Sequence, residues 1–78
     1  MSKVEIGLVG AGPIAIEYVK VLNQFNKQVN LSCVVTRSKE NHLKIKRIFP
    51  KIKKVDTVEI LYKKYRPKIV IVAINELA

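Results

Sequence analysis

VEIGLVGAGPIA, residues 4–15, is the stretch that decides the fold of this chain. Its first six residues form a short, nearly continuous apolar run, which is typical of a strand buried on both faces of a parallel sheet. Gly10 can take the backbone through a tight turn, and Gly12 has no Cβ, so a pyrophosphate can approach its main chain closely. The order of strand, glycine turn and helix start is the order that a dinucleotide site requires.

The start of the first helix supports the same interpretation. Pro13 suits the first helical turn because its ring presets φ, but it removes one N–H, so Gly12 and Ile14 must carry more of a phosphate contact. Ala15 stands where a third glycine is often found and is small enough for close packing of helix and strand. A glycine turn without a ligand is the alternative interpretation, and the strands and helices around the motif favour the nucleotide.

Strand and helix patterns alternate along the whole chain. The first helix carries an apolar face that we expect in the core, made of Ile14, Tyr18, Val21, Leu22 and Phe25. Ser38 is the expected N-cap of the second helix. Asp56, followed by the acidic Glu59 three residues later, is the expected N-cap of the third helix. The predicted strands span residues 4–9, 29–36, 52–55 and 68–74, and the predicted helices span residues 13–26, 38–48 and 57–65.

This alternation predicts an α/β fold, a three-layer Rossmann-type half domain with the order β-α-β-α-β-α-β. We expect one domain over residues 1–78, a parallel sheet with strand order 3-2-1-4, and a ligand crevice between the first and fourth strands. The fourth strand, rich in valine and isoleucine, is expected to be an unprotected edge that invites pairing with another chain.

Composition narrows the classes of partner. The net charge is +9, and residues 27–54 carry +8 of it. Only Phe49 is aromatic in that stretch, so a nucleic-acid partner is not expected. No apolar run reaches the roughly 20 residues of a membrane helix, and the N-terminus does not resemble a secretory signal. Cys33 lies in an apolar strand as core filler, and a single cysteine is typical of a reducing cytoplasm.

Three segments resemble the Gfo/Idh/MocA oxidoreductases, the family of glucose–fructose oxidoreductase and inositol dehydrogenase. IGLVGAGPIA (6–15) is similar to the family's opening, residues 29–38 to its second strand and the turn that selects the cofactor, and VIVAINEL (70–77) to the end of its fourth strand. Two departures stand out: Ile74 replaces the usual Thr-Pro pair, and Ala78 stands where histidine is common. Family members continue through a Glu-Lys-Pro segment, whose lysine contributes to catalysis, into a substrate domain.

The turn after the second strand carries the choice of cofactor. NAD-preferring sites place an Asp or Glu there to bind the ribose 2′-OH. Thr36, Arg37 and Ser38 occupy the turn here, and none of them is a carboxylate. Arg37 can pair with a 2′-phosphate, so NADP is favoured over NAD. At the end of the fourth strand, Ala73, Asn75 and Glu76 complete the expected site, and the last two can reach the nicotinamide ribose.

The resemblance implies the nucleotide-binding N-terminal domain of an NAD(P)-dependent oxidoreductase that acts on a sugar, polyol or related carbohydrate. No catalytic residue or metal site is expected in this chain, because it shows no acid–base pair and His42 is interpreted as a surface residue. Chemistry therefore needs a substrate domain that the chain lacks or a homo-oligomeric partner. The alternative is a non-catalytic nucleotide-binding module, or a truncated remnant that pairs with another chain.

Overall fold

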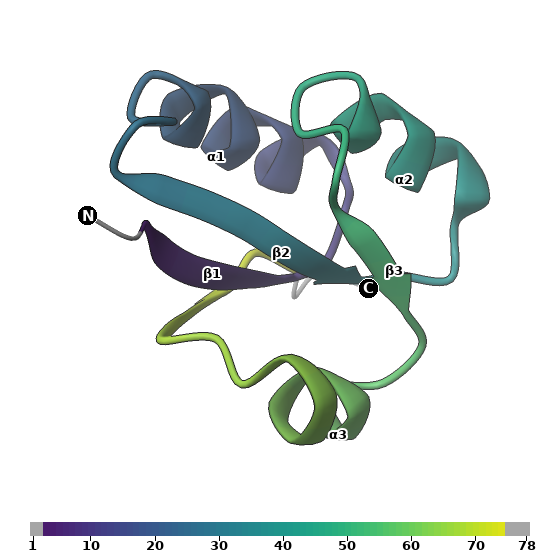
Figure 1. The fold of residues 1–78 in the computed structure, drawn as a ribbon. Coiled ribbons are helices and arrows are strands. Elements are labelled where there is room, and N and C mark those ends of the chain that lie inside the picture. Colours follow the sequence, from purple (N-terminus) through teal and green to yellow (C-terminus); the bar gives the residue numbers. More distant parts are fainter. Residues whose placement is uncertain (1–2, 75–78) are drawn as a thin grey trace.

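A four-stranded parallel sheet lies between two layers of helices in the computed structural model, which describes residues 3–74 (Figure 1). The strand order is β3-β2-β1-β4, so the predicted α/β half domain and its strand order are confirmed. The elements are β1 (Val4–Val9), α1 (Pro13–Asn23), β2 (Val29–Val35), α2 (Lys39–Lys46), β3 (Lys53–Val55), α3 (Val58–Ile60), the π-helical turn η1 (Leu61–Tyr65) and β4 (Ile69–Val72).

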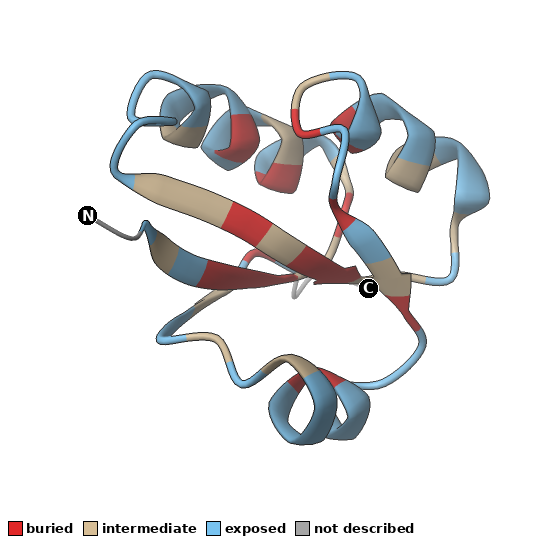
Figure 2. Ribbon diagram, viewed as in Figure 1, coloured by how far each residue is buried: buried red, intermediate tan, exposed pale blue. Residues whose placement is uncertain are grey.

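Each face of the sheet has its own apolar core (Figure 2). α1 and α2 cover one face, where Leu8 and Leu31 of the sheet pack with Val19 and Ile45 of the helices. α3 and η1 cover the other face, where Leu61 packs against Cys33 and Val55. The short α3–η1 segment is the crossover that carries the chain from one edge strand, β3, to the other, β4.

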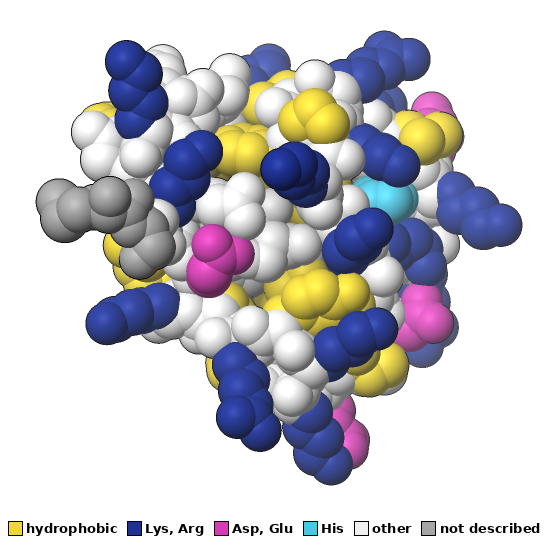
Figure 3. All heavy atoms as spheres, viewed as in Figure 1, with side chains coloured by type: hydrophobic (Ala, Val, Ile, Leu, Met, Phe, Trp, Pro, Cys, Tyr) yellow, Lys and Arg dark blue, Asp and Glu magenta, His cyan; other side chains and the backbone are white. Residues whose placement is uncertain are grey.

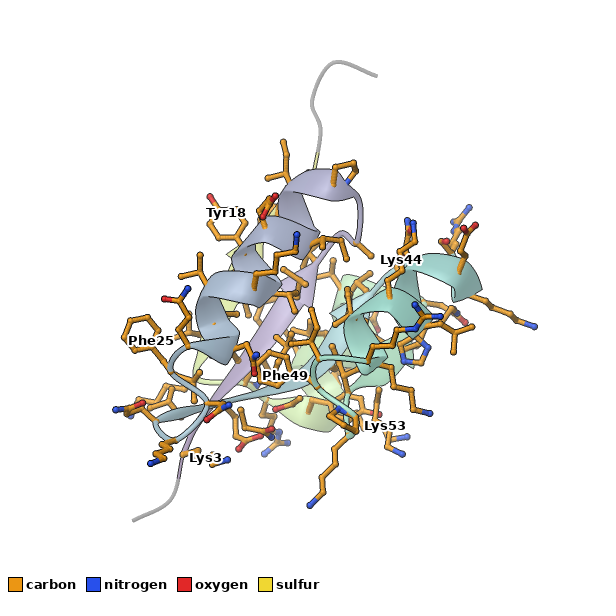
Figure 4. The ribbon with its side chains drawn as sticks, turned by 90° about the horizontal axis from the view of Figure 1, so that it is seen from above. Lys3, Tyr18, Phe25, Lys44, Phe49 and Lys53 are labelled. Carbon is orange, nitrogen blue, oxygen red and sulfur yellow. The ribbon has the colours of Figure 1, made fainter. Side chains whose placement is uncertain are left out.

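The predicted core face of α1 is wrong for most of its members. Ile14, Tyr18, Val21 and Phe25 are about half exposed, whereas Ala15 and Val19 are fully buried. Only Leu22 of the predicted face packs against the core. The small side chains of Ala15 and Val19 allow α1 to lie close to the sheet, and the larger side chains of Tyr18 and Phe25 point sideways, away from α2 (Figure 4).

The cap of the third helix is also corrected. Thr57, not Asp56, is the N-cap, and its hydroxyl oxygen accepts a hydrogen bond from the amide of Ile60 at 3.1 Å. Thr57 is the last extended residue before the helix, so its side chain is the one placed to reach the first free amides. The predicted cap of α2 is confirmed, since Ser38 Oγ accepts from the amide of Asn41 at 3.1 Å.

Several ends differ by a few residues from the prediction. α1 ends at Asn23 rather than near residue 26, because the chain then turns through successive short-range backbone hydrogen bonds. The third helix ends at Tyr65 as expected, but it does so as a π-helical turn, and Arg66 takes a left-handed φ of 43° before Pro67. β4 pairs with β1 over only four residues, within the longer predicted range.

Charge is carried on the surface. Lys and Arg side chains spread over the visible face of the molecule, with few acidic side chains among them (Figure 3). Among residues 3–74, no buried polar or charged residue is present. Across that same range, none of the helices has the length and apolar character that crossing a membrane demands.

Candidate functional site

The carboxyl ends of all four parallel strands meet at one edge of the sheet, and backbone hydrogen bonds fix their order there. The amide of Ala73 donates to Val9 O at 2.9 Å, which joins the ends of β4 and β1. The amide of Gly10 donates to Val35 O at 3.0 Å, which joins β1 to β2. The glycine turn therefore lies between the end of β4 and the turn after β2, as a dinucleotide site at the switch in strand order requires.

Gly10 is held in a conformation that favours glycine. Its φ is +101°, and a Cβ built on it would lie 2.5 Å from Ala73 O and 2.9 Å from Ile74 Cγ2. Any side chain would collide with the end of β4, and the backbone angle disfavours L-residues in addition. The structure therefore assigns Gly10 to the tight turn itself, as the sequence predicts.

Gly12 has a different role, because its surroundings leave room for a side chain. Its φ of −77° suits any residue, and a Cβ built on it would meet no atom within 4 Å. Folding alone therefore gives no reason for glycine at this position. The open space lies beside the main chain at the start of α1, which is where a pyrophosphate approaches a dinucleotide-binding helix.

The start of α1 offers a hydrogen-bond donor to that space. Gly12 is the N-cap without a side-chain acceptor, and Pro13 is the first helical residue, as predicted. Gly12 O accepts from the amide of Ile16 at 3.0 Å, whereas the amide of Ile14, which lines the hollow, has no protein acceptor among residues 3–74. Ala15 is fully buried, which allows the close helix–sheet contact. The residues present thus fit a bound pyrophosphate.

A hollow of about 270 Å³ opens at this point, where the sequence places the crevice between β1 and β4. Its walls are mostly apolar, and the free amide of Ile14 lies at its edge. The lining residues are Gly10, Ala11, Gly12, Pro13, Ile14, Ala73 and Ile74. A larger hollow of about 530 Å³ lies at the opposite end of the sheet, beside Glu5, Val29 and Phe49, and it shares no residue with the glycine turn.

The turn after β2 lies next to the glycine turn and keeps its polar groups available. Thr36 Oγ1 accepts a hydrogen bond from the amide of Ser38 at 3.1 Å, and Ser38 Oγ caps α2 by accepting from the amide of Asn41. Both hydroxyl oxygens therefore accept hydrogen bonds from the backbone of this turn. Each hydroxyl still has its own O–H to donate. Arg37 is exposed between them. Of the residues predicted for the site, Asn75 and Glu76 fall outside the described residues.

Two charged side chains that the sequence did not indicate for the site, Lys54 and Asp56, lie beside this turn in the structure. The amide of Thr36 donates to Val55 O at 3.2 Å, which puts the end of β3 next to the end of β2. Lys54 Nζ donates to Asp56 Oδ1 at 2.9 Å there. Lys54 holds the pKa of the Asp56 carboxyl below its usual value, and Arg37 contributes in the same direction. The predicted order of the parallel strands could have indicated this, because it places the ends of the second and third strands side by side.

The described residues hold few groups suited to catalysis. Residues 3–74 contain no group of three or more His, Cys, Asp or Glu side chains that could hold a metal ion. Cys33 is fully buried, and burial, together with the charge of Glu5, raises the pKa of its thiol to about 11. A buried thiol with so high a pKa is a poor nucleophile at neutral pH, in agreement with the expected packing role.

Comparisons with known proteins agree with this geometry. One solved structure is similar, a protein from Desulfitobacterium hafniense DCB-2 described as a "putative NADPH-dependent oxidoreductase", with a TM-score of 0.69 and 19% identity. The match covers 92% of this chain and 20% of that one, so the chain spans about one fifth of that protein's length. No curated protein gives a significant match. The model of the oxidoreductase family with an NAD-binding Rossmann fold, Gfo/Idh/MocA, matches residues 4–76, and the chain belongs to that family.

Proposed function

We propose that this chain is the dinucleotide-binding domain of an NAD(P)-dependent oxidoreductase and that it binds NADP(H) in preference to NAD(H). The observation that carries the proposal is the open space at Gly12, because neither the backbone angle nor packing requires glycine there. The free amide of Ile14 borders that space, and it supplies a donor at the positive end of α1 for a pyrophosphate. When bound, a nicotinamide dinucleotide accepts or donates a hydride.

The preference for NADP rests on the turn after β2. A carboxylate in this turn normally accepts the ribose 2′-OH in NAD sites, and residues 36–38 contain none. The exposed guanidinium of Arg37 is free to pair with a 2′-phosphate, and the hydroxyls of Thr36 and Ser38 can donate to it. Toward the other end of the cofactor, we assign Ala73, Asn75 and Glu76 to the nicotinamide side of the site.

A sugar, polyol or related carbohydrate is the substrate that the family resemblance suggests for the whole protein, in the cytoplasm. The chemistry would be completed by a substrate domain or by a second copy of the chain, because residues 3–74 supply no metal-binding cluster and their only cysteine is buried. This lack of reactive groups also favours the second candidate, a nucleotide-binding module without catalysis of its own. Turnover assays of the longest natural form of the protein separate the two.

The binding proposal is tested by titrating the chain with NADPH and NADH in a calorimeter. We expect both to bind, with NADPH tighter. Arg37→Ala should weaken NADPH binding by about 1.5–3 kcal/mol, the usual value for a hydrogen bond to a charged group, and change NADH binding much less. Thr36→Asp should shift the preference toward NADH.

Arg47→Ala is the matched control, since Arg47 is also exposed and its loss removes the same charge at the far end of α2. If the folded chain binds neither nucleotide, the proposed function is wrong for this chain. Equal losses for both nucleotides in Arg37→Ala would contradict the contact with the 2′-phosphate.

A further inference from the structure

Arg37, in the proposed cofactor turn after β2, lies near two charged side chains at the end of β3, Lys54 and Asp56. Lys54 pairs with Val34 across β3 and β2, and the amide of Thr36 donates to Val55 O at 3.2 Å. The end of β3, which Asp56 follows, therefore lies beside the turn after β2 that carries Arg37. The sequence separates Arg37 from Asp56 by a whole helix, but the parallel pairing of β2 with β3 brings them to one place.

The pair of Lys54 and Asp56 is unequally exposed. Lys54 Nζ lies 2.9 Å from Asp56 Oδ1, and the exposed fractions of the two side chains are 23% and 72%. The Lys54 side chain is therefore mostly buried, whereas the Asp56 carboxylate is mostly exposed to solvent. Two cations and one carboxylate at this place leave a single net positive charge.

We infer that Asp56 limits how strongly this turn prefers a 2′-phosphorylated nucleotide, by offsetting the charge of Arg37 and Lys54. This inference rests on the proposed function, since it concerns the adenosine end of the same site. Asp56 is a specificity-determining residue that acts through its charge on the two cations. A ligand with a free ribose 2′-OH has no charge at the 2′ position, so its affinity depends much less on Asp56.

The size of the effect follows from elementary electrostatics. A phosphate monoester carries about −1.5 to −2 charges at neutral pH. Removing one unit charge that lies several ångströms from this phosphate, in a solvent-exposed site, changes the affinity for the phosphate by about fivefold at moderate salt. The change is smaller at high salt because of screening. The solvent exposure of Asp56 makes this high-dielectric estimate the appropriate one.

The test uses the complete chain with two small probes, 2′,5′-ADP and 5′-ADP, measured by calorimetry. Asp56→Asn should bind 2′,5′-ADP about fivefold more tightly and leave 5′-ADP within twofold. Lys54→Gln should shift 2′,5′-ADP in the opposite direction. Asp56 does not cap the helix, because Thr57 does, so the variant is expected to fold, and circular dichroism checks this. Asp56→Ser serves as a second variant that removes the same charge.

Glu59→Gln is a matched control. Glu59 Oε1 lies 2.9 Å from Lys63 Nζ, and its side chain is 71% exposed, close to the 72% of Asp56, so its replacement removes the same charge from an equally exposed carboxylate on the crossover helix. This control should leave the ratio of the two affinities unchanged. A ratio that rises in Asp56→Asn because 2′,5′-ADP binds more tightly, and that does not rise in Glu59→Gln, supports the inference.

Three results would overturn the inference. An unchanged ratio in Asp56→Asn shows that the carboxylate does not act on the site. Weaker 5′-ADP binding in this variant shows that Asp56 accepts the ribose hydroxyl directly instead. An equal gain in Glu59→Gln shows a general effect of net charge. In all three cases 5′-ADP still binds to the unmodified chain, whereas loss of all nucleotide binding refutes the proposed function as well.

Discussion

Substitutions at the two glycines of the turn should separate folding from binding. Gly10→Ala places a Cβ 2.5 Å from Ala73 O in a backbone with φ of +101°, whereas Gly12→Val fills a space with no atom within 4 Å of its Cβ. The first change therefore damages the fold, and the second blocks the approach of a pyrophosphate. The sequence predicts different roles for the two glycines, and the space around each of them in the structure agrees with this difference.

The magnitudes can be worked from these contacts. A left-handed backbone costs an L-residue about 1–2 kcal/mol, and forcing extra atoms into a packed place costs about 1–3 kcal/mol more. Gly10→Ala should thus lose about 2–5 kcal/mol, a large part of the ~4–12 kcal/mol expected for a domain of this size. For Gly12→Val, a poorer N-cap is offset by a less flexible unfolded chain, so stability should change by about 1 kcal/mol or less.

Urea unfolding followed by circular dichroism measures the stability of each variant, and calorimetry with NADPH measures binding. Gly12→Val should fold like the unmodified chain and bind NADPH at least about tenfold more weakly. If Gly12→Val folds normally and keeps full affinity, the pyrophosphate does not lie over Gly12. If Gly10→Ala keeps full stability, the contact with the end of β4 is not as tight as the structure shows.

Further predictions concern activity, assembly and the buried thiol. Residues 1–78 alone should not oxidise or reduce any sugar or polyol with NADP(H) or NAD(H), and measurable turnover in a spectrophotometric assay contradicts this. Among the described residues β4 pairs only with β1, and it exposes Ile69 and Val72, so the chain should dimerise or aggregate. Sedimentation at increasing protein concentration tests this, and a monomer at high concentration contradicts it. Burial raises the pKa of Cys33 to about 11, so the unfolded thiol ionises first and the free energy of unfolding should fall between about pH 9 and 11. Cys33→Ala should lose that component of the pH dependence.

Much of the fold could be predicted because its determinants are local. Gly10, Pro13 and Ser38 each act on the backbone within a few residues of themselves, and the structure confirms the turn, the helix start and the cap. Alternating strands and helices then leave few possible strand orders, since crossovers are right-handed. Helix ends were less predictable. The sequence predicts a helix to Tyr65 but does not distinguish the π-helical turn at Leu61–Tyr65 from an α-helix.

The site shows the same division between local and distant information. The glycine turn and the turn at residues 36–38 are each contiguous, so the sequence indicates both. The neighbourhood of Asp56 is not contiguous, because it depends on the pairing of Val35 with Val55. Asp56 was interpreted as a helix cap from its own surroundings, and only the strand pairing shows it beside Arg37. A search of every predicted strand end for charged residues would have found it.

The wrong face of α1 shows how sheet geometry overrides helix periodicity. α1 has two neighbouring apolar faces, a large one with Ile14, Tyr18 and Phe25 and a smaller one with Ala15 and Val19. Periodicity favours the larger face, but a strand–glycine–helix turn leaves little distance between helix and sheet, so only small side chains fit there. Tyr18 and Phe25 of the larger face then point sideways, away from α2 (Figure 4). An apolar face in this position is compatible with a partner there, and sedimentation of Tyr18→Lys and Phe25→Lys variants decides whether self-association depends on α1 or on β4.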